Sequence, residues 1–88
     1  MKIIFTKAIT KDIKKIKDKK LIAKITEVIT NMEQVSAIEQ LAGVKKLSSQ
    51  QMAFRTRIGD YRLGFFLEND TIILARFLKR ADIYKVFP

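Results

Sequence analysis

The sequence contains no cysteine, no histidine and only one proline, and these absences narrow what the protein can be. Without cysteine the chain has no disulfides, no thiolate metal sites and no thiol nucleophile, which fits the cytoplasm. No apolar run approaches the roughly 20 residues that span a bilayer, and the N-terminal run is too short for a signal peptide. No acidic cluster that would hold a metal is visible either. We therefore expect a cytoplasmic protein with no membrane segment, metal or cofactor.

Signals of a domain boundary are equally scarce in the sequence. The proline is the last residue, and the sequence has no repeat, low-complexity tract or linker. A chain of 88 residues that is 48% hydrophobic is long enough for one modest core. We predict a single domain over residues 1–88.

Charge of one sign is abundant. The chain has 18 lysines and arginines against 9 acidic residues, a formal net charge of +9. Such a surplus favours polyanionic partners, either nucleic acid or an acidic protein segment. All five arginines lie in the second half, whereas eleven of the thirteen lysines lie at or before Lys46. Since lysine suits solvated faces and the planar guanidinium suits phosphate, this predicts a basic helical surface and a separate arginine site.

The first half reads as one strand and two helices. A strand is predicted at Lys2–Phe5, with Thr6 as the N-cap of the helix that follows. Isoleucines recur at helical spacing in two stripes, Ile9, Ile13 and Ile16, then Ile22, Ile25, Ile29 and Met32. The second stripe is about 120° out of phase with the first, so one straight helix would carry two apolar faces. We therefore predict a break near Asp18–Lys20 and a two-helix hairpin.

The second half changes to a period of two, which is typical of strands. A short strand is expected at residues 44–47 and longer ones at 54–58, 62–67 and 72–78. Gly59 and Asp60 have the composition of a type II′ hairpin turn, and Asn69 and Asp70 are a second turn signal. Residues 81–88 fit either a short helical turn or a final strand. The order predicts an α+β fold: an N-terminal strand, a two-helix hairpin, then an antiparallel sheet of three to four strands. The helices would cover one face of the sheet and leave the other open.

The predicted hairpin gathers arginines on one face. A Gly59–Asp60 loop pairs Arg57 with Arg62, although like charges placed opposite each other are destabilising. Arg55 lies two residues back and opposite Gly64, where we expect a gap with no side chain in it. Such self-repulsion is expected where an anion is meant to sit, because guanidinium forks match phosphate oxygens.

Three further residues are candidates for the same site. A two-residue loop at Asn69–Asp70 would put Arg76 on the face opposite Arg62, and a three-residue loop would bring it over Gly64. If the chain end is helical, Arg80 and Tyr84 lie four apart and share a face. The stretch also contains Lys79.

With these residues assembled, the chain resembles the RelE/ParE superfamily of bacterial type II toxins over nearly its whole length. The segment FRTRIGDYR (54–62) is similar to the family's aromatic-Arg-x-Arg-x-Gly-Asp-Tyr-Arg pattern. The ending KRADIY (79–84) is similar to the family's His-Arg-x-x-x-Tyr, with Lys79 in the histidine slot.

The resemblance implies a toxin that a cognate antitoxin holds inactive. In the RelE-like branch the toxin cuts messenger RNA on the ribosome; in the ParE-like branch it poisons DNA gyrase. Residues that match Arg62, Arg80 and Tyr84 carry cleavage in the RelE-like branch, supported by those that match Arg55 and Arg57. The best-known nucleases of the family have lysines at these last two positions, where this sequence has arginines.

Cleavage by the 2′-hydroxyl needs charge stabilisation at phosphorus and proton transfer at two oxygens. Arginines, together with Arg76 if the sheet register allows, supply the first but stay protonated. Tyr84 is the phenol placed to be a base, with a phenolate favoured by neighbouring positive charges, and Lys79 is either the acid or a charge contact. We therefore expect a metal-independent endoribonuclease. The alternatives are a gyrase inhibitor and a nucleic-acid-binding module that acts mainly through its charge.

Overall fold

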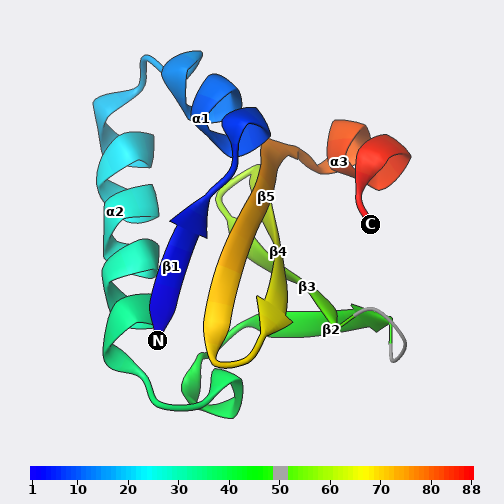
Figure 1. The fold of residues 1–88 in the computed structure, drawn as a ribbon. Coiled ribbons are helices and arrows are strands. Elements are labelled where there is room, and N and C mark those ends of the chain that lie inside the picture. Colours follow the sequence, from blue (N-terminus) through cyan, green and yellow to red (C-terminus); the bar gives the residue numbers. More distant parts are fainter. Residues whose placement is uncertain (49–51) are drawn as a thin grey trace.

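A computed structural model describes residues 1–48 and 52–88 (Figure 1). The elements are β1 (Lys2–Phe5), α1 (Lys7–Lys14), α2 (Lys19–Gln34), the 3₁₀ turn η1 (Ile38–Gln40), β2 (Val44–Ser48), β3 (Ala53–Ile58), β4 (Tyr61–Glu68), β5 (Thr71–Lys79) and α3 (Arg80–Val86). The predicted α+β order is confirmed, and the chain end takes the helical alternative. Among the described residues, no helix combines the length and the hydrophobicity needed to cross a bilayer.

The strands form one mixed sheet in the order β1-β5-β4-β3-β2. Strands β2 to β5 are antiparallel neighbours, and β1 lies parallel to β5. The sheet has five strands rather than the three to four predicted, because the N-terminal strand joins it as an edge. This leaves β5 between β1 and β4, with the C-terminal end of β5 leading directly into α3.

Side-chain caps set the starts of the first two helices. The Thr6 hydroxyl accepts the N–H of Ile9, as predicted for an N-cap. The carboxylate of Asp18 accepts the N–H groups of Lys20 and Leu21 at 2.9 and 3.4 Å and starts α2. The predicted break between two helices is therefore confirmed, and a capping aspartate supplies it where glycine and proline are absent.

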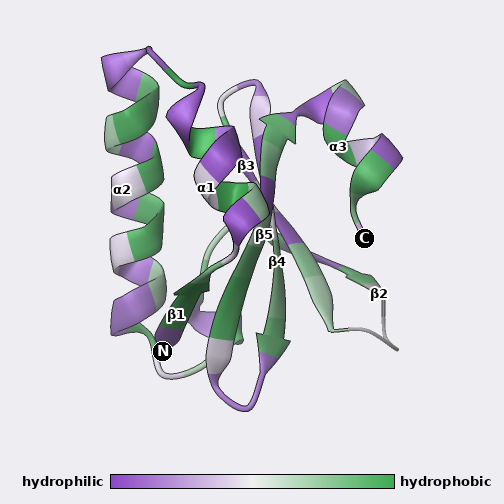
Figure 2. Cartoon of the chain, turned by 45° about the horizontal axis from the view of Figure 1, so that its top comes forward, coloured by the Kyte–Doolittle hydropathy of each residue, from purple (hydrophilic) through white to green (hydrophobic). Residues whose placement is uncertain are grey.

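The larger core lies between the sheet and the first two helices, whose apolar stripes are visible in Figure 2. Its fully buried side chains include Ile9, Met32, Leu63, Phe65, Ile72 and Leu74. A second, smaller core of Ala53, Ile83 and Phe87 lies where α3 packs on β4 and β5. The two predicted helices cover one face of the sheet as expected, but the other face is not left open, because α3 and Phe87 occupy part of it.

Both hairpin turns contain two residues. Gly59 has a φ of +61°, a backbone region that an L side chain rarely adopts, and the register pairs Arg57 with Arg62 and Arg55 with Gly64 as predicted. At the second turn, Glu68 pairs with Thr71, the shorter of the two loops considered. A register shift after Gly64 then places Arg76 opposite Gly64, so loop length alone does not decide the position of Arg76.

One buried carboxylate joins α1 to β5. Asp12, whose side chain is 4% exposed, accepts two hydrogen bonds from the Arg76 guanidinium at 2.8 and 3.2 Å. It also accepts the backbone N–H of Phe77 at 2.9 Å. The planar fork of arginine matches a carboxylate in this bidentate way, which fixes the helix against the strand. The contact keeps the pKa of Arg76 above its ordinary value, chiefly through the hydrogen bonds that Arg76 donates to Asp12.

Replacing Asp12 by alanine should lower the free energy of unfolding by about 2–3 kcal/mol, because three N–H groups lose their acceptor. The loss stays below the ~3–5 kcal/mol typical of a fully buried pair, since Arg76 is partly exposed. Urea denaturation followed by circular dichroism measures it. Glu27→Ala, at an exposed position of α2, is the matched control and should change stability by less than about 0.5 kcal/mol. Equal losses in the two variants would show that the Asp12 contact contributes nothing particular.

Candidate RNA-binding and cleavage site

The β3–β4 turn holds two opposed arginines in place. The Nε of Arg57 donates to the carbonyl oxygen of Gly59 at 3.2 Å. The Nη1 of Arg62 donates to the same oxygen at 3.4 Å and to that of Tyr61 at 3.0 Å. The acceptors are neutral carbonyls, so these contacts orient both guanidinium groups without neutralising their positive charges.

These arginines line a hollow of about 350 Å³ between the turn and the start of α3. The lining residues are Arg57, Gly59, Asp60, Arg62, Lys79, Arg80 and Ala81. The N–H of Arg80 donates to the carbonyl of Asp60 at 3.2 Å, which ties the helix to the turn. The lining thus has four cationic side chains and one carboxylate, so the hollow suits a phosphate group.

Tyr84 lies beside this hollow, one helical turn after Arg80. The Nε of Arg80 donates to the Tyr84 hydroxyl at 3.0 Å, as the predicted spacing of four in a helix allows. The guanidinium of Arg55 lies over the tyrosine ring, with Cζ 4.4 Å from the ring centroid. Tyr84 remains 48% exposed, so a ligand can reach the residue from solvent.

The surroundings lower the pKa of the Tyr84 phenol from its ordinary value of 10.0. The hydrogen bond from Arg80 is the largest cause, and the charges of Arg55, Arg80 and Arg62 act in the same direction. Desolvation opposes them by disfavouring the phenolate. Because an anionic oxygen is what a proton acceptor needs, this environment makes the phenol a better general base than a free tyrosine.

Two expectations about the site are corrected. The predicted gap opposite Arg55 is filled: a Cβ built on Gly64 would lie 2.6 Å from Cδ2 of the Phe87 ring. Arg76 does not join the cluster, because its guanidinium is bound to Asp12, and we leave it out of the proposed phosphate site. The packing of Phe87 on Gly64 was not predicted from the sequence, although a glycine inside a strand often marks a place where another group approaches the backbone closely.

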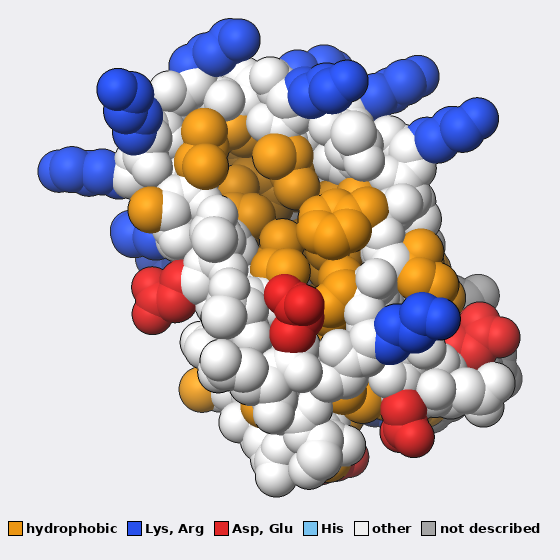
Figure 3. All heavy atoms as spheres, turned by 60° about the vertical axis from the view of Figure 1, so that its left-hand side comes forward, with side chains coloured by type: hydrophobic (Ala, Val, Ile, Leu, Met, Phe, Trp, Pro, Cys, Tyr) orange, Lys and Arg blue, Asp and Glu red, His pale blue; other side chains and the backbone are white. Residues whose placement is uncertain are grey.

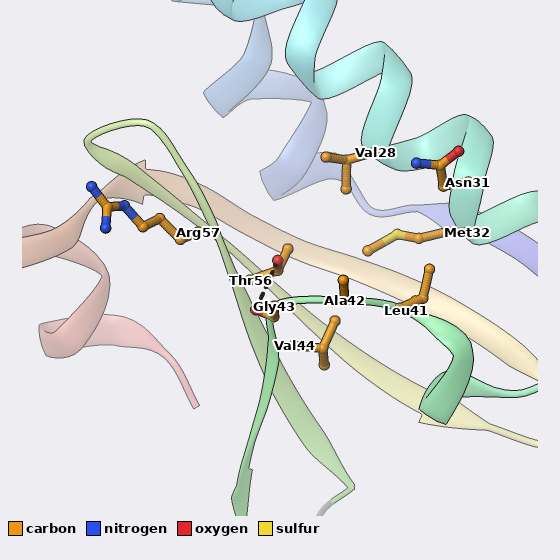
Figure 4. A pocket seen from close by; sticks show the side chains of 9 residues that line it. All are labelled: Val28, Asn31, Met32, Leu41, Ala42, Gly43, Val44, Thr56 and Arg57. Carbon is orange, nitrogen blue, oxygen red and sulfur yellow. Dashed lines mark hydrogen bonds between the residues drawn. The ribbon is translucent and has the colours of Figure 1, made fainter.

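A second pocket, of about 220 Å³, lies between α2, β2 and β3 (Figure 4). Val28, Met32, Leu41 and Val44 give it a mainly apolar lining, and the Thr56 hydroxyl donates to the carbonyl of Gly43. The guanidinium of Arg57 points away from this pocket, toward the hairpin turn (Figure 4). Over the part of the chain that the structure describes, no three acidic side chains gather to hold a metal ion.

Comparison with known proteins identifies the family. A family model described as "ParE toxin of type II toxin-antitoxin system, parDE" matches residues 3–84. Toxin RelE3 of Methanocaldococcus jannaschii is 34% identical over 90 aligned residues, which cover 100% of both chains. The chain belongs to the RelE/ParE superfamily. It is a toxin of a type II toxin–antitoxin system.

Solved structures agree with this assignment. A chain of the RelB-RelE antitoxin-toxin complex from Methanococcus jannaschii matches the toxin with a TM-score of 0.80 at 29% identity, over 97% of the toxin and 99% of that chain. A chain of the heterotetrameric YoeB-YefM toxin-antitoxin complex from Staphylococcus aureus matches with a TM-score of 0.69 at 26% identity, over 90% and 94% of the two chains. The superfamily resemblance drawn from the two sequence segments is thus confirmed.

Replacing Arg80 by methionine should raise the pKa of Tyr84 toward 10.0, because the largest cause of its lowering is removed. The titration is followed by phenolate absorbance in a Tyr61→Phe background, where Tyr84 is the one remaining tyrosine. Lys85→Met removes the same charge from the exposed neighbour of Tyr84 and should leave the titration nearly unchanged. Identical curves for the two variants would mean that the Arg80 hydrogen bond does not act on the phenol in solution.

Proposed function

We propose that the toxin is a metal-independent endoribonuclease that cuts messenger RNA in the decoding site of the ribosome. The observation that carries this proposal is the 3.0 Å contact between the Arg80 guanidinium and the Tyr84 hydroxyl, at the side of a cationic hollow. The resemblance of FRTRIGDYR and KRADIY to the RelE-like branch supports the same reading. We infer that the toxin acts in the cytoplasm, where the ribosome is.

The hollow seats the phosphate that is to be cut. Arg57, Arg62 and Arg80 offer forked donors to its non-bridging oxygens. The negative charge on these oxygens grows as the 2′-oxygen attacks phosphorus, so the guanidinium groups bind the transition state more strongly than the ground state. Arg55, over the ring of Tyr84, adds positive charge next to the reacting groups.

Protons move at two places. The Tyr84 phenolate accepts the proton of the 2′-hydroxyl as the new P–O bond forms. The bond to the 5′-oxygen then breaks, and the Lys79 ammonium, which lines the hollow, supplies the proton that this oxygen needs. The products are a 2′,3′-cyclic phosphate and a free 5′-hydroxyl. With no histidine in the chain, these two groups take the places that imidazoles fill in many nucleases.

Inhibition of DNA gyrase is the second candidate function. It is favoured by the match to the family model of ParE toxins. Gyrase inhibition is a binding function and gives no role to a proton acceptor at Tyr84. The nuclease therefore explains more of the site's geometry.

Tyr84→Phe should reduce cleavage about 10²–10⁴-fold, the usual contribution of a general base, while the fold is retained. Arg62→Ala should also strongly reduce cleavage, because a phosphate contact is lost. Primer extension on transcripts after brief induction measures the breaks. The matched control is Tyr61→Phe, which removes a hydroxyl from a ring stacked on Phe77 and should still cut.

Two results would count against this assignment. Full cleavage by Tyr84→Phe would remove the phenol from the chemistry. Growth arrest with intact transcripts and a DNA-damage response would move the proposal to gyrase.

We infer that the antitoxin covers an apolar groove on the helical face of the toxin. Figure 3 shows exposed hydrophobic side chains on this face, with basic side chains mainly along its upper edge and acidic side chains near the centre and below. The groove, of about 280 Å³, is lined by Phe5, Ile13, Ile22, Ile25, Thr26, Ile29, Thr30 and Glu33. Phe5 is 52% exposed and Ile22 is 39% exposed.

Eight lysines fall within residues 7–24, so an amphipathic segment with acidic flanks is the complementary partner. The RelB-RelE and YoeB-YefM structures are themselves complexes with an antitoxin.

Phe5→Asp should weaken binding of the co-expressed antitoxin by at least about 30-fold, because a central apolar anchor becomes a desolvated charge. Isothermal titration calorimetry measures the change. Val86→Asp, at a similarly exposed position in α3, is the control and should bind as the parent does. Unchanged affinity of Phe5→Asp, with weakened Val86→Asp, would move the interface to the α3 face.

A further inference from the structure

The helix that carries Arg80 and Tyr84 is too short to hold itself in place. Helix α3 has seven residues, and isolated helices of this length are unstable in water. The side chains of Arg80 and Tyr84 are exposed, so their own burial does not fix the helix. The opposite side of α3 is held by Ile83 and by the following Phe87, which are 0% and 6% exposed.

The Phe87 ring packs on the sheet at Gly64, where the strand has no side chain. A Cβ built on Gly64 would lie 2.6, 2.7 and 2.8 Å from three atoms of the Phe87 ring, distances that real Cβ atoms do not show. The ring also packs on Phe66, with centroids 5.1 Å apart and planes tilted by 57°. Any residue other than glycine at position 64 would therefore displace the ring.

Gly64 is also connected to the site by strand pairing. In the register of the sheet, Gly64 is the partner of Arg55 on β3. Phe87 lies three residues after Tyr84, and its N–H donates to the carbonyl of Ile83 at 2.9 Å, which continues the turn of α3. One contact thus connects the strand partner of Arg55 to the helix that bears Tyr84.

We propose that Gly64 and Phe87 are positioning residues for the site. The packing of the Phe87 ring on the backbone of Gly64 fixes the distance of α3 from the sheet and its rotation about its axis. This position of α3 places Tyr84 under the Arg55 guanidinium. This inference concerns the geometry of the site whose function is proposed above. It is tested by a measurement that needs neither RNA nor a ribosome.

The experiment compares the ionisation of Tyr84 in the Tyr61→Phe background. The variants are Phe87→Leu, Phe87→Ala, Gly64→Ala and the double variant Gly64→Ala/Phe87→Ala. Each single change should raise the pKa of Tyr84 toward its ordinary value, because the phenol moves away from Arg55 and Arg80, and Phe87→Leu should do so least. In the double variant the pKa should be no higher than in Phe87→Ala alone, because the added methyl no longer meets a ring. Val86→Ala, at the exposed neighbour of Phe87, is the control.

A purely structural role predicts a different outcome. If Phe87 only adds buried surface, the variants lower the melting temperature while Tyr84 titrates as in the parent below that temperature. Unshifted titration in the folded Gly64→Ala and Phe87→Leu proteins would overturn the proposal, even if Phe87→Ala fails to fold. An additive double variant would also overturn it.

Cleavage provides a separate readout. If the toxin cuts RNA as proposed, Gly64→Ala should lower kcat about 10²-fold, the cost of a small misplacement of a reacting group, with little change in KM. If the parent toxin cuts no RNA, the proposed function fails while the titration still decides the positioning role.

Discussion

The arrangement of the molecule depends on the hydrogen bonds that the buried Asp12 carboxylate accepts from Arg76 and Phe77. The carboxylate joins the first helix to β5, the strand that pairs with both β1 and β4. Lys79 ends that strand and Arg80 begins α3. The contact that fixes β5 against α1 therefore also fixes the position of the first residue of α3. Arg76 contributes to this joint rather than to the proposed phosphate site. A guanidinium that looks free for ligand binding in the sequence is thus used to build the frame.

The two kinds of cation are used on different surfaces. Basic side chains lie mainly along one edge of the helical face and extend outward, where charged groups remain hydrated. Arginines gather on the β3–β4 hairpin and α3, where forked donors are aimed at one place. Because the two surfaces are built from different halves of the chain, changes that tune the antitoxin groove need not disturb the site that we propose for RNA.

Local signals in the sequence predict most of the fold, because caps, turns and periodicity act over a few residues. Thr6, Asp18 and Gly59 each act within their own segment, and the β3–β4 register follows directly from a two-residue turn. The contact of Phe87 with Gly64 joins two elements that are separate in the chain, so the glycine signals a close approach but no local pattern identifies Phe87 as the partner. The placement of Arg76 depends on a register shift inside β4–β5, which loop length does not specify. The cluster at Tyr84 could be anticipated because the helical spacing of Arg80 and Tyr84 is local.

The carbonyl of Gly59 accepts donors from both Arg57 and Arg62, and this has a consequence for how the protein behaves in different buffers. A neutral oxygen orients two like charges without cancelling them, so their mutual repulsion remains in the folded state. An ion that binds the folded form and not the unfolded one stabilises it in proportion to the logarithm of its concentration over its dissociation constant. If the hollow binds phosphate as we propose, phosphate and sulfate should therefore stabilise the folded toxin and raise its melting temperature above that in chloride of equal ionic strength.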